Sequence, residues 1–149
     1  MKKAFHVFLP CCFVFTLLFV CLAAQGDDIN PNLTMSPFKI ILNAKCLGTQ
    51  QDIQAILDVS PTVYENICGD IELRFGKVSA TIKAASFRYC YIDTNLLVSF
   101  DRAEVQQYLV DHEIIGDTTA TVTGTYKKDD VTLTFVGTDS VEVVSPSKK

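Results

Sequence analysis

The sequence predicts an all-β fold, an antiparallel β-sandwich of seven to eight short strands with one short helix. Three features indicate this architecture. Several segments alternate apolar and polar side chains with the period of two that a half-buried strand requires. Turn signals rich in Gly, Pro, Asn and Asp recur every eight to twelve residues between those segments. The apolar spacing changes to that of a helix directly after Asp101.

Four strands are expected before residue 95, at 38–44, 52–59, 71–75 and 78–83, and 87–92 is a further short candidate. The clearest is Ile71–Phe75, where apolar and polar residues alternate strictly. Gly76 and Lys77 then turn the chain, so 78–83 is expected to be its hairpin partner. The segment 52–59 alternates less regularly, and its Gln and Ala residues would also tolerate a helix. Residues 60–67 are interpreted as a loop that folds back onto the core.

The segment Leu96–Leu109, LLVSFDRAEVQQYL, is expected to pass from a buried strand straight into a short helix. Its first half is almost continuously apolar. Asp101 is the expected helix cap, because a carboxylate at that position accepts hydrogen bonds from the first free N–H groups of a helix. Glu104, three residues later, completes a pattern that resembles a capping box.

The C-terminal third is expected to form three more strands, at 119–126, 131–135 and 140–144. The first of them has threonine at every second position, which predicts one solvated face and one buried face. The charged residues 127–130 are expected to form a hairpin loop, and 137–139 a further turn. The total is the strand pattern of a two-sheet sandwich.

The first 24 residues have the form of a secretory signal peptide. Lys2 and Lys3 precede an uncharged, mostly apolar run, Val7–Ala24, which ends in small residues suited to cleavage. The alternative is an uncleaved anchor, because a run of this length could just span a bilayer. We therefore expect a protein that is secreted, periplasmic or on the cell surface, with the membrane as a partner only if the segment is uncleaved.

The remaining chain is expected to hold a single domain, with 25–37 as a flexible tether, 38–144 as the β-sandwich and 145–149 as a disordered tail. Without residues 1–24, eleven basic residues remain against 17 acidic ones, a net charge of −6. An acidic surface without a basic run argues against nucleic acid as a partner.

Three cysteines remain after the signal segment, Cys46, Cys68 and Cys90. In an exported protein a disulfide is allowed, and an odd number permits at most one within the chain. Cys46 and Cys90 are the preferred pair because each lies in or beside an expected strand. The alternative is that the cysteines are small buried apolar residues.

The sequence gives little support for an active site. The sole histidine after the signal segment, His112, lies at the expected end of the helix, where the helix dipole explains it. No phosphate-binding loop, dinucleotide fingerprint or zinc-protease motif is present in the sequence. We therefore expect no catalytic residue, cofactor or metal, and a protein that is not an enzyme.

Three blocks of sequence, at 53–75, 95–109 and 119–144, together resemble the sequence pattern of a known family. The most specific block is FDRAEVQQYL, which resembles the pattern F-D-R-x-x-V-x-x-x-L of Ig-like β-sandwich modules. Those modules occur in exported bacterial and archaeal surface proteins, often near dockerin-type or repeat segments. The resemblance implies an Ig-like sandwich and no enzymatic activity.

The resemblance departs from the family before the F-D-R block. Family members often carry an aspartate-rich stretch there that resembles a calcium loop. Here the matching positions, 88–95, supply only Asp93 and Asn95 as carboxylate or amide ligands, too few for calcium. Cys90 in this stretch, together with Cys46 near the first expected strand, favours a disulfide as another means of fixing the loop.

The expected role is structural, adhesive or protein-binding, outside the cytoplasm and with an unknown protein or glycan partner. The alternative is a carbohydrate-binding module that uses exposed tyrosines. Tyr89 and Tyr91 are two residues apart, so on a strand they would point the same way and form a small platform for a sugar ring. The other interpretation of this pair is a half-buried edge of the core.

Overall fold

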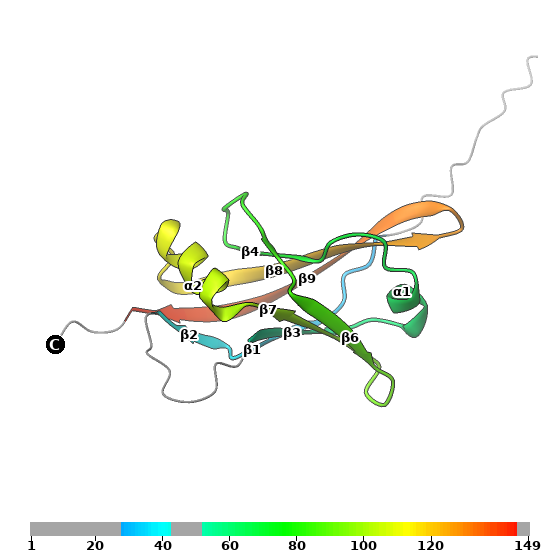
Figure 1. The fold of residues 1–149 in the computed structure, drawn as a ribbon, viewed down its shortest axis with the longest axis horizontal. Helices are drawn as coiled ribbons and strands as arrows, with labels where there is room; N and C mark the ends of the chain where they lie inside the picture. The colour runs from blue at the N-terminus through cyan, green and yellow to red at the C-terminus, as the bar shows by residue number, and fades with distance from the viewer. Residues whose placement is uncertain (1–27, 43–51, 146–149) are drawn as a thin grey trace, which may run out of the picture.

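The computed structural model describes residues 28–42 and 52–145, which form two β-sheets around one apolar core. The elements in chain order are β1 (Leu33–Ser36), β2 (Lys39–Ile41), β3 (Ile53–Asp58), α1 (Pro61–Glu65), β4 (Glu72–Phe75), β5 (Ile82–Lys83), β6 (Ser86–Cys90), β7 (Asn95–Phe100), α2 (Arg102–Asp111), β8 (Gly116–Lys128) and β9 (Val131–Val144). Figure 1 shows an elongated molecule with α2 across one end and α1 near the other. The all-β prediction is confirmed at this level.

The strands form a four-stranded sheet in the order β1-β3-β7-β6 and a five-stranded sheet in the order β2-β9-β8-β4-β5. All neighbours are antiparallel except β2 and β9, which run parallel. The chain crosses from one sheet to the other five times between these strands, and two of the links are only two residues long. Pro37 and Phe38 link β1 to β2, and Ala84 and Ala85 link β5 to β6.

The core lies between the sheets, where the period-two pattern of each strand places its apolar residues. In β7 the residues Leu96, Val98 and Phe100 are fully buried, and they alternate with partly exposed residues. The threonine pattern of β8 has the expected sense in its middle, where Ala120, Val122, Gly124 and Tyr126 are buried, although Thr121 on the other face is buried too. Because the pairing partners share these faces, both sheets bury one side against the other.

Helix α2 closes one end of the core through Val105, Tyr108 and Leu109. The Tyr108 hydroxyl donates a 2.8 Å hydrogen bond to the carbonyl of Ala80, in the link between β4 and β5. Its ring centroid lies 5.9 Å from that of Phe75. The helix therefore packs on the five-stranded sheet and also fixes the β4–β5 link.

Both ends of α2 are capped. Asp101 is the N-cap residue, and its Oδ1 accepts a 2.9 Å hydrogen bond from the Glu104 N–H. At the other end His112 is the C-cap residue, with its Nδ1 2.8 Å from the Tyr108 carbonyl oxygen. These contacts satisfy backbone groups that a short helix otherwise leaves without partners.

Residues 28–42 and 52–145 form nine strands and two helices, so the expected count of seven to eight strands and one helix is wrong. One additional strand, β1, lies inside the segment 25–37 that the sequence predicts to be a tether. β1 pairs with β3, its residues Leu33 and Met35 are buried in the core, and Ile29 bridges to Phe135 of β9. Alternating apolar residues between prolines give this segment enough to bury, although its composition is that of a linker.

Three further elements differ from expectation. Residues 61–65, expected in a loop, form the helix α1, because Ser60 caps it and Pro61 occupies its first turn. The expected turn at 137–139 lies inside β9, which continues unbroken to Val144. The hairpin partner of β4 is only two residues long, because 78–81 lie outside the ladder.

The expected signal peptide at 1–24 and nearly all of the expected tail, 146–149, lie outside the described residues. Within the described part of the chain, neither helix is long and apolar enough to cross a bilayer.

Candidate binding surface

The two tyrosines singled out by the sequence lie at the edge of the four-stranded sheet. Tyr89 belongs to β6, which is the last strand of that sheet and pairs with β7 on one side. Tyr91 follows in the turn of residues 91–94 between β6 and β7. Both side chains meet a third ring, that of Tyr64 on α1, which reaches this edge from more than twenty residues upstream.

Four rings, Tyr64, Phe87, Tyr89 and Tyr91, make up what we call the aromatic cluster. Tyr64 stacks on Tyr89, with ring centroids 5.0 Å apart and an angle of 20° between the planes. It meets Phe87 and Tyr91 edge-on, with both centroids at 6.5 Å. Stacked and edge-to-face rings at these distances attract each other beyond their simple burial. The cluster is therefore held in place before any ligand arrives.

Tyr89 anchors the cluster to the body of the domain. Its hydroxyl donates a 2.8 Å hydrogen bond to the carbonyl of Val59, just after β3. Burial raises the pKa of the Tyr89 hydroxyl, and the nearby carboxylate of Asp58 adds to the effect. The proton of this bond is thus held more firmly than that of a free tyrosine.

The two tyrosines do not form the flat platform that the sequence suggests. Their ring centroids are 4.9 Å apart, but the planes meet at 77°. One face of Tyr89 is covered by Tyr64, so Tyr91, which is 63% exposed, is the main accessible ring of the pair. Phe87 is 43% exposed and Ile92, in the same turn, is 92% exposed. The result is an uneven apolar surface along a sheet edge.

The pairing of β6 with β7 shows on which face of the sheet each β6 side chain lies. Phe87 is opposite Val98, and Tyr89 is opposite Leu96, so both lie on the core-facing side of the sheet. Arg88 is opposite Leu97 and lies on the outer side. The Arg88 side chain is exposed and forms no ion pair within the described part of the chain.

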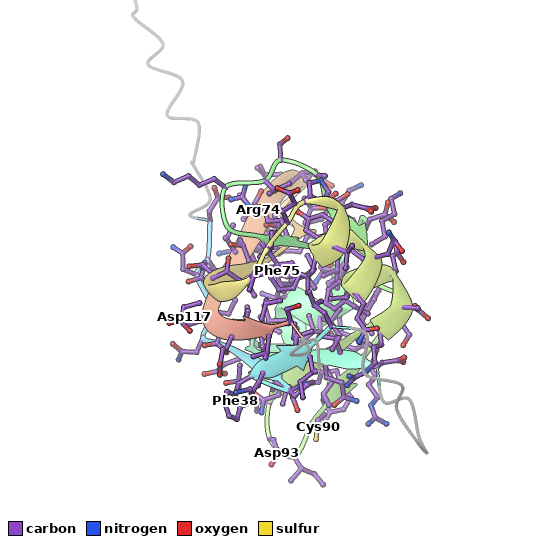
Figure 2. All side chains as sticks on the ribbon, turned by 90° about the vertical axis from the view of Figure 1, so that its left-hand side faces the viewer. Phe38, Arg74, Phe75, Cys90, Asp93 and Asp117 are labelled. Atoms are coloured by element: carbon purple, nitrogen blue, oxygen red, sulfur yellow. The ribbon has the colours of Figure 1, made fainter. Side chains whose placement is uncertain are left out.

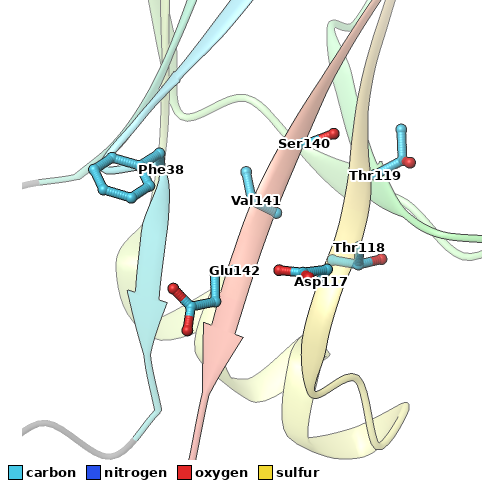
Figure 3. Close-up of a pocket in the computed structure, with 7 residues that line it drawn as sticks. All are labelled: Phe38, Asp117, Thr118, Thr119, Ser140, Val141 and Glu142. Carbon is cyan, nitrogen blue, oxygen red and sulfur yellow. The ribbon is translucent and has the colours of Figure 1, made fainter.

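A second candidate is a groove of about 510 Å³ on the five-stranded sheet, which we call the acidic groove. It is lined by Phe38, Asp117, Thr118, Thr119, Ser140, Val141 and Glu142. Figure 3 shows the Phe38 ring on one side, with the carboxylates of Glu142 and Asp117 on neighbouring strands. Glu142 already pairs with Lys39 at 3.0 Å. The groove therefore offers one carboxylate, that of Asp117, without an ion pair among the described residues.

The cysteines do not show the expected link. Cys68 and Cys90 are free thiols, and Cys46 lies outside the described residues, so a Cys46–Cys90 disulfide is not supported. The Sγ of Cys90 instead lies 3.4 Å from Asp93 Oδ2. Figure 2 shows these two side chains near the turn after β6, away from Arg74 of the other sheet.

The described residues bring together no group of three or more His, Cys, Asp or Glu side chains that could hold a metal ion. His112 caps α2 and lies beside the Tyr108 ring, with centroids 4.4 Å apart. Tyr64 is the functional candidate that sequence reasoning missed. The Ser60-Pro61 pair could have indicated its helix, but nothing local indicates that the helix meets β6.

Comparison of the chain with protein-family profiles, with curated proteins and with solved structures found no match in any of the three.

Proposed function

We propose that this chain is an extracytoplasmic, non-enzymatic binding module with an Ig-like sandwich fold, which recognises another protein through the aromatic cluster. The observation that carries the proposal is an ordered group of four rings on a sheet edge. Exposed aromatic residues contribute strongly to protein binding because they bury a large area at little conformational cost. A surface already ordered by its own stacking loses still less entropy on binding.

The fold class supports the role without specifying the partner. The two sheets pair almost entirely antiparallel, which suits the Ig-like sandwich that the resemblance implies. Export, which residues 1–24 predict, would place the module where adhesive and scaffolding proteins act. The alternative, carbohydrate binding through tyrosines, is supported by the exposed ring of Tyr91, but the 77° angle to Tyr89 reduces the flat area available to a sugar.

The test is selection from a displayed library of random peptides, followed by affinity measurement on two variants. Tyr91→Ala removes the exposed ring, and Ile115→Ala is the matched control because both side chains are 63% exposed. We expect peptides whose binding is lost with Tyr91→Ala and kept with Ile115→Ala. The proposal is wrong if no peptide is enriched, or if Ile115→Ala has the larger effect.

A glycan array with the same two variants addresses the alternative. A glycan signal that disappears with Tyr91→Ala, together with no enriched peptide, would replace the protein-binding proposal by the carbohydrate-binding one. Loss of folding is checked separately, by comparing the thermal melting of each variant with that of the parent protein.

A further inference from the structure

The kind of partner can also be inferred, because β6 carries two rings of the aromatic cluster and is an edge strand of its sheet. In the sheet order β1-β3-β7-β6, β6 has no further neighbour among the described residues. The edge of β6 that points away from β7, which we call the open edge, therefore presents main-chain N–H and C=O groups that the ladder with β7 does not use. An extended segment can add to such an edge as one more strand.

The faces of β6 restrict the sequence of that segment. In a ladder, residues opposite one another share a face, whether the strands are parallel or antiparallel. A residue opposite Arg88 would lie on the outer side of the sheet, beside the guanidinium group. Its two neighbours would lie on the other side, against Phe87 and Tyr89 of the aromatic cluster.

The charge of Arg88 determines which type of residue fits opposite it in the added segment. The side chain is exposed and has no ion-pair partner within residues 28–42 and 52–145, although the chain is acidic overall. Opposite charges facing each other across a strand pair attract, and like charges repel. A carboxylate therefore fits opposite Arg88, and apolar side chains fit opposite the rings.

Resting on the proposed binding function, we propose that the partner is an extended protein segment with the pattern apolar–acidic–apolar, which adds to the open edge of β6 as a fifth strand of that sheet. A second copy of this chain fits less well. Self-pairing of two β6 strands about Arg88 would bring two arginines face to face.

The alternation is tested with three blocked peptides of defined sequence. Thr-Thr-Val-Glu-Val-Thr-Thr has the proposed pattern. Thr-Val-Thr-Glu-Thr-Val-Thr has the same composition but places valines and glutamate on one face. A third peptide carries Lys in place of the Glu of the first. We expect the first to bind about three- to tenfold more tightly than either of the others.

The role of Arg88 is tested by charge reversal. Arg88→Glu should weaken the Glu peptide and strengthen the Lys peptide by about three- to tenfold each. Lys127→Glu is the control, because it makes the same change of charge at an exposed position on the β8–β9 hairpin. Methylating the amide nitrogens on the side of the peptide that faces β6 should abolish binding, since strand addition needs those N–H groups.

The outcomes separate this inference from the proposed function. Equal binding of the first two peptides, with Tyr91→Ala still abolishing binding, would overturn strand addition and leave the aromatic surface standing. Binding that ignores Tyr91→Ala would overturn both. A dimer that strengthens with concentration and is lost in Ser86→Pro would show that a second copy takes the edge, and would overturn the assignment of a foreign segment.

Discussion

Gly124 and Phe135 face each other across β8 and β9, and the ring occupies the space that a side chain at 124 would need. A Cβ there would lie 2.2 Å from the Cζ of Phe135, whose side chain is fully buried. Gly124→Ala should therefore lower the free energy of unfolding by about 1–3 kcal/mol, the usual cost of overpacking. Urea denaturation measures this change.

Two controls accompany that substitution. Thr123→Ala, on the outer side of the same strand, should cost much less. Combining Gly124→Ala with Phe135→Leu should cost less than the two changes added together, because the smaller side chain makes room for the methyl group. Undiminished stability of Gly124→Ala would contradict the packing described for this pair.

Two tyrosine hydroxyls link the domain's stability to high pH. Tyr89 and Tyr108 each donate to a main-chain carbonyl at 2.8 Å, and burial raises the pKa of both. The folded state then holds these protons more tightly than the unfolded chain. Their contribution is complete below the ordinary pKa of about 10 and is lost as pH rises through the raised values.

We therefore expect the free energy of unfolding to fall at alkaline pH, and to fall less steeply in the double variant Tyr89→Phe/Tyr108→Phe. Urea unfolding at about pH 8 and about pH 11 gives the comparison. Lys83, whose pKa is raised by its hydrogen bond to Asp70, adds a loss of the same sign that both proteins share. Equal slopes in the two proteins would show that the hydroxyls do not contribute.

Within the secondary-structure elements, the N-terminus of α2 depends on a single carboxylate. Asp101→Ala removes the acceptor for the Glu104 N–H and should cost about 1 kcal/mol of stability. Asp101→Asn keeps an oxygen acceptor and should cost only a fraction of that. Thermal melting of both variants decides. Unchanged stability of Asp101→Ala, together with loss of peptide binding, would move this residue from the helix cap to the binding surface.

The β8–β9 hairpin turns through two residues with positive φ, Asp129 at 50° and Asp130 at 63°. A two-residue turn with both angles positive is of type I′, which favours glycine at its second position. Asp130→Gly should therefore stabilise the domain, by a few tenths to about 1 kcal/mol. Asp130→Val should destabilise it, because a β-branched residue resists this conformation. The opposite order in a urea titration would contradict the turn geometry.

The elements that the sequence predicted well are those whose signals are local. Alternation in Ile71–Phe75, and the change of period at Asp101, identify β4 and the β7–α2 junction to within a residue. Gly137 was misleading because its lack of a side chain serves packing and not turning. A Cβ at this position would lie 3.0 Å from Leu33 and from Leu57, on the opposite sheet. That requirement belongs to the folded domain and leaves no local pattern.

For the domain as a whole, strand pairing and the composition of the binding surface were beyond local reasoning. Tyr89 and Tyr91 could be singled out by their spacing, but Tyr64 joins them only because α1 packs against β6. The parallel pairing of β2 with β9 likewise joins residues about a hundred positions apart. Such contacts form only when the two sheets pack together. The sequence therefore predicted that there are two sheets, but not which segments meet at the edges of each sheet.

For the molecule as a whole, the edge at β6 combines the ordered aromatic cluster with the exposed cation of Arg88, on a chain that is acidic overall. Amide hydrogen exchange, measured with and without the peptide Thr-Thr-Val-Glu-Val-Thr-Thr, tests the role of this edge most directly. Our account predicts slower exchange on binding in β6, Ser86–Cys90, with little change elsewhere. Slower exchange confined to residues 117–119 and 140–142 of the acidic groove, or none in β6, would contradict it.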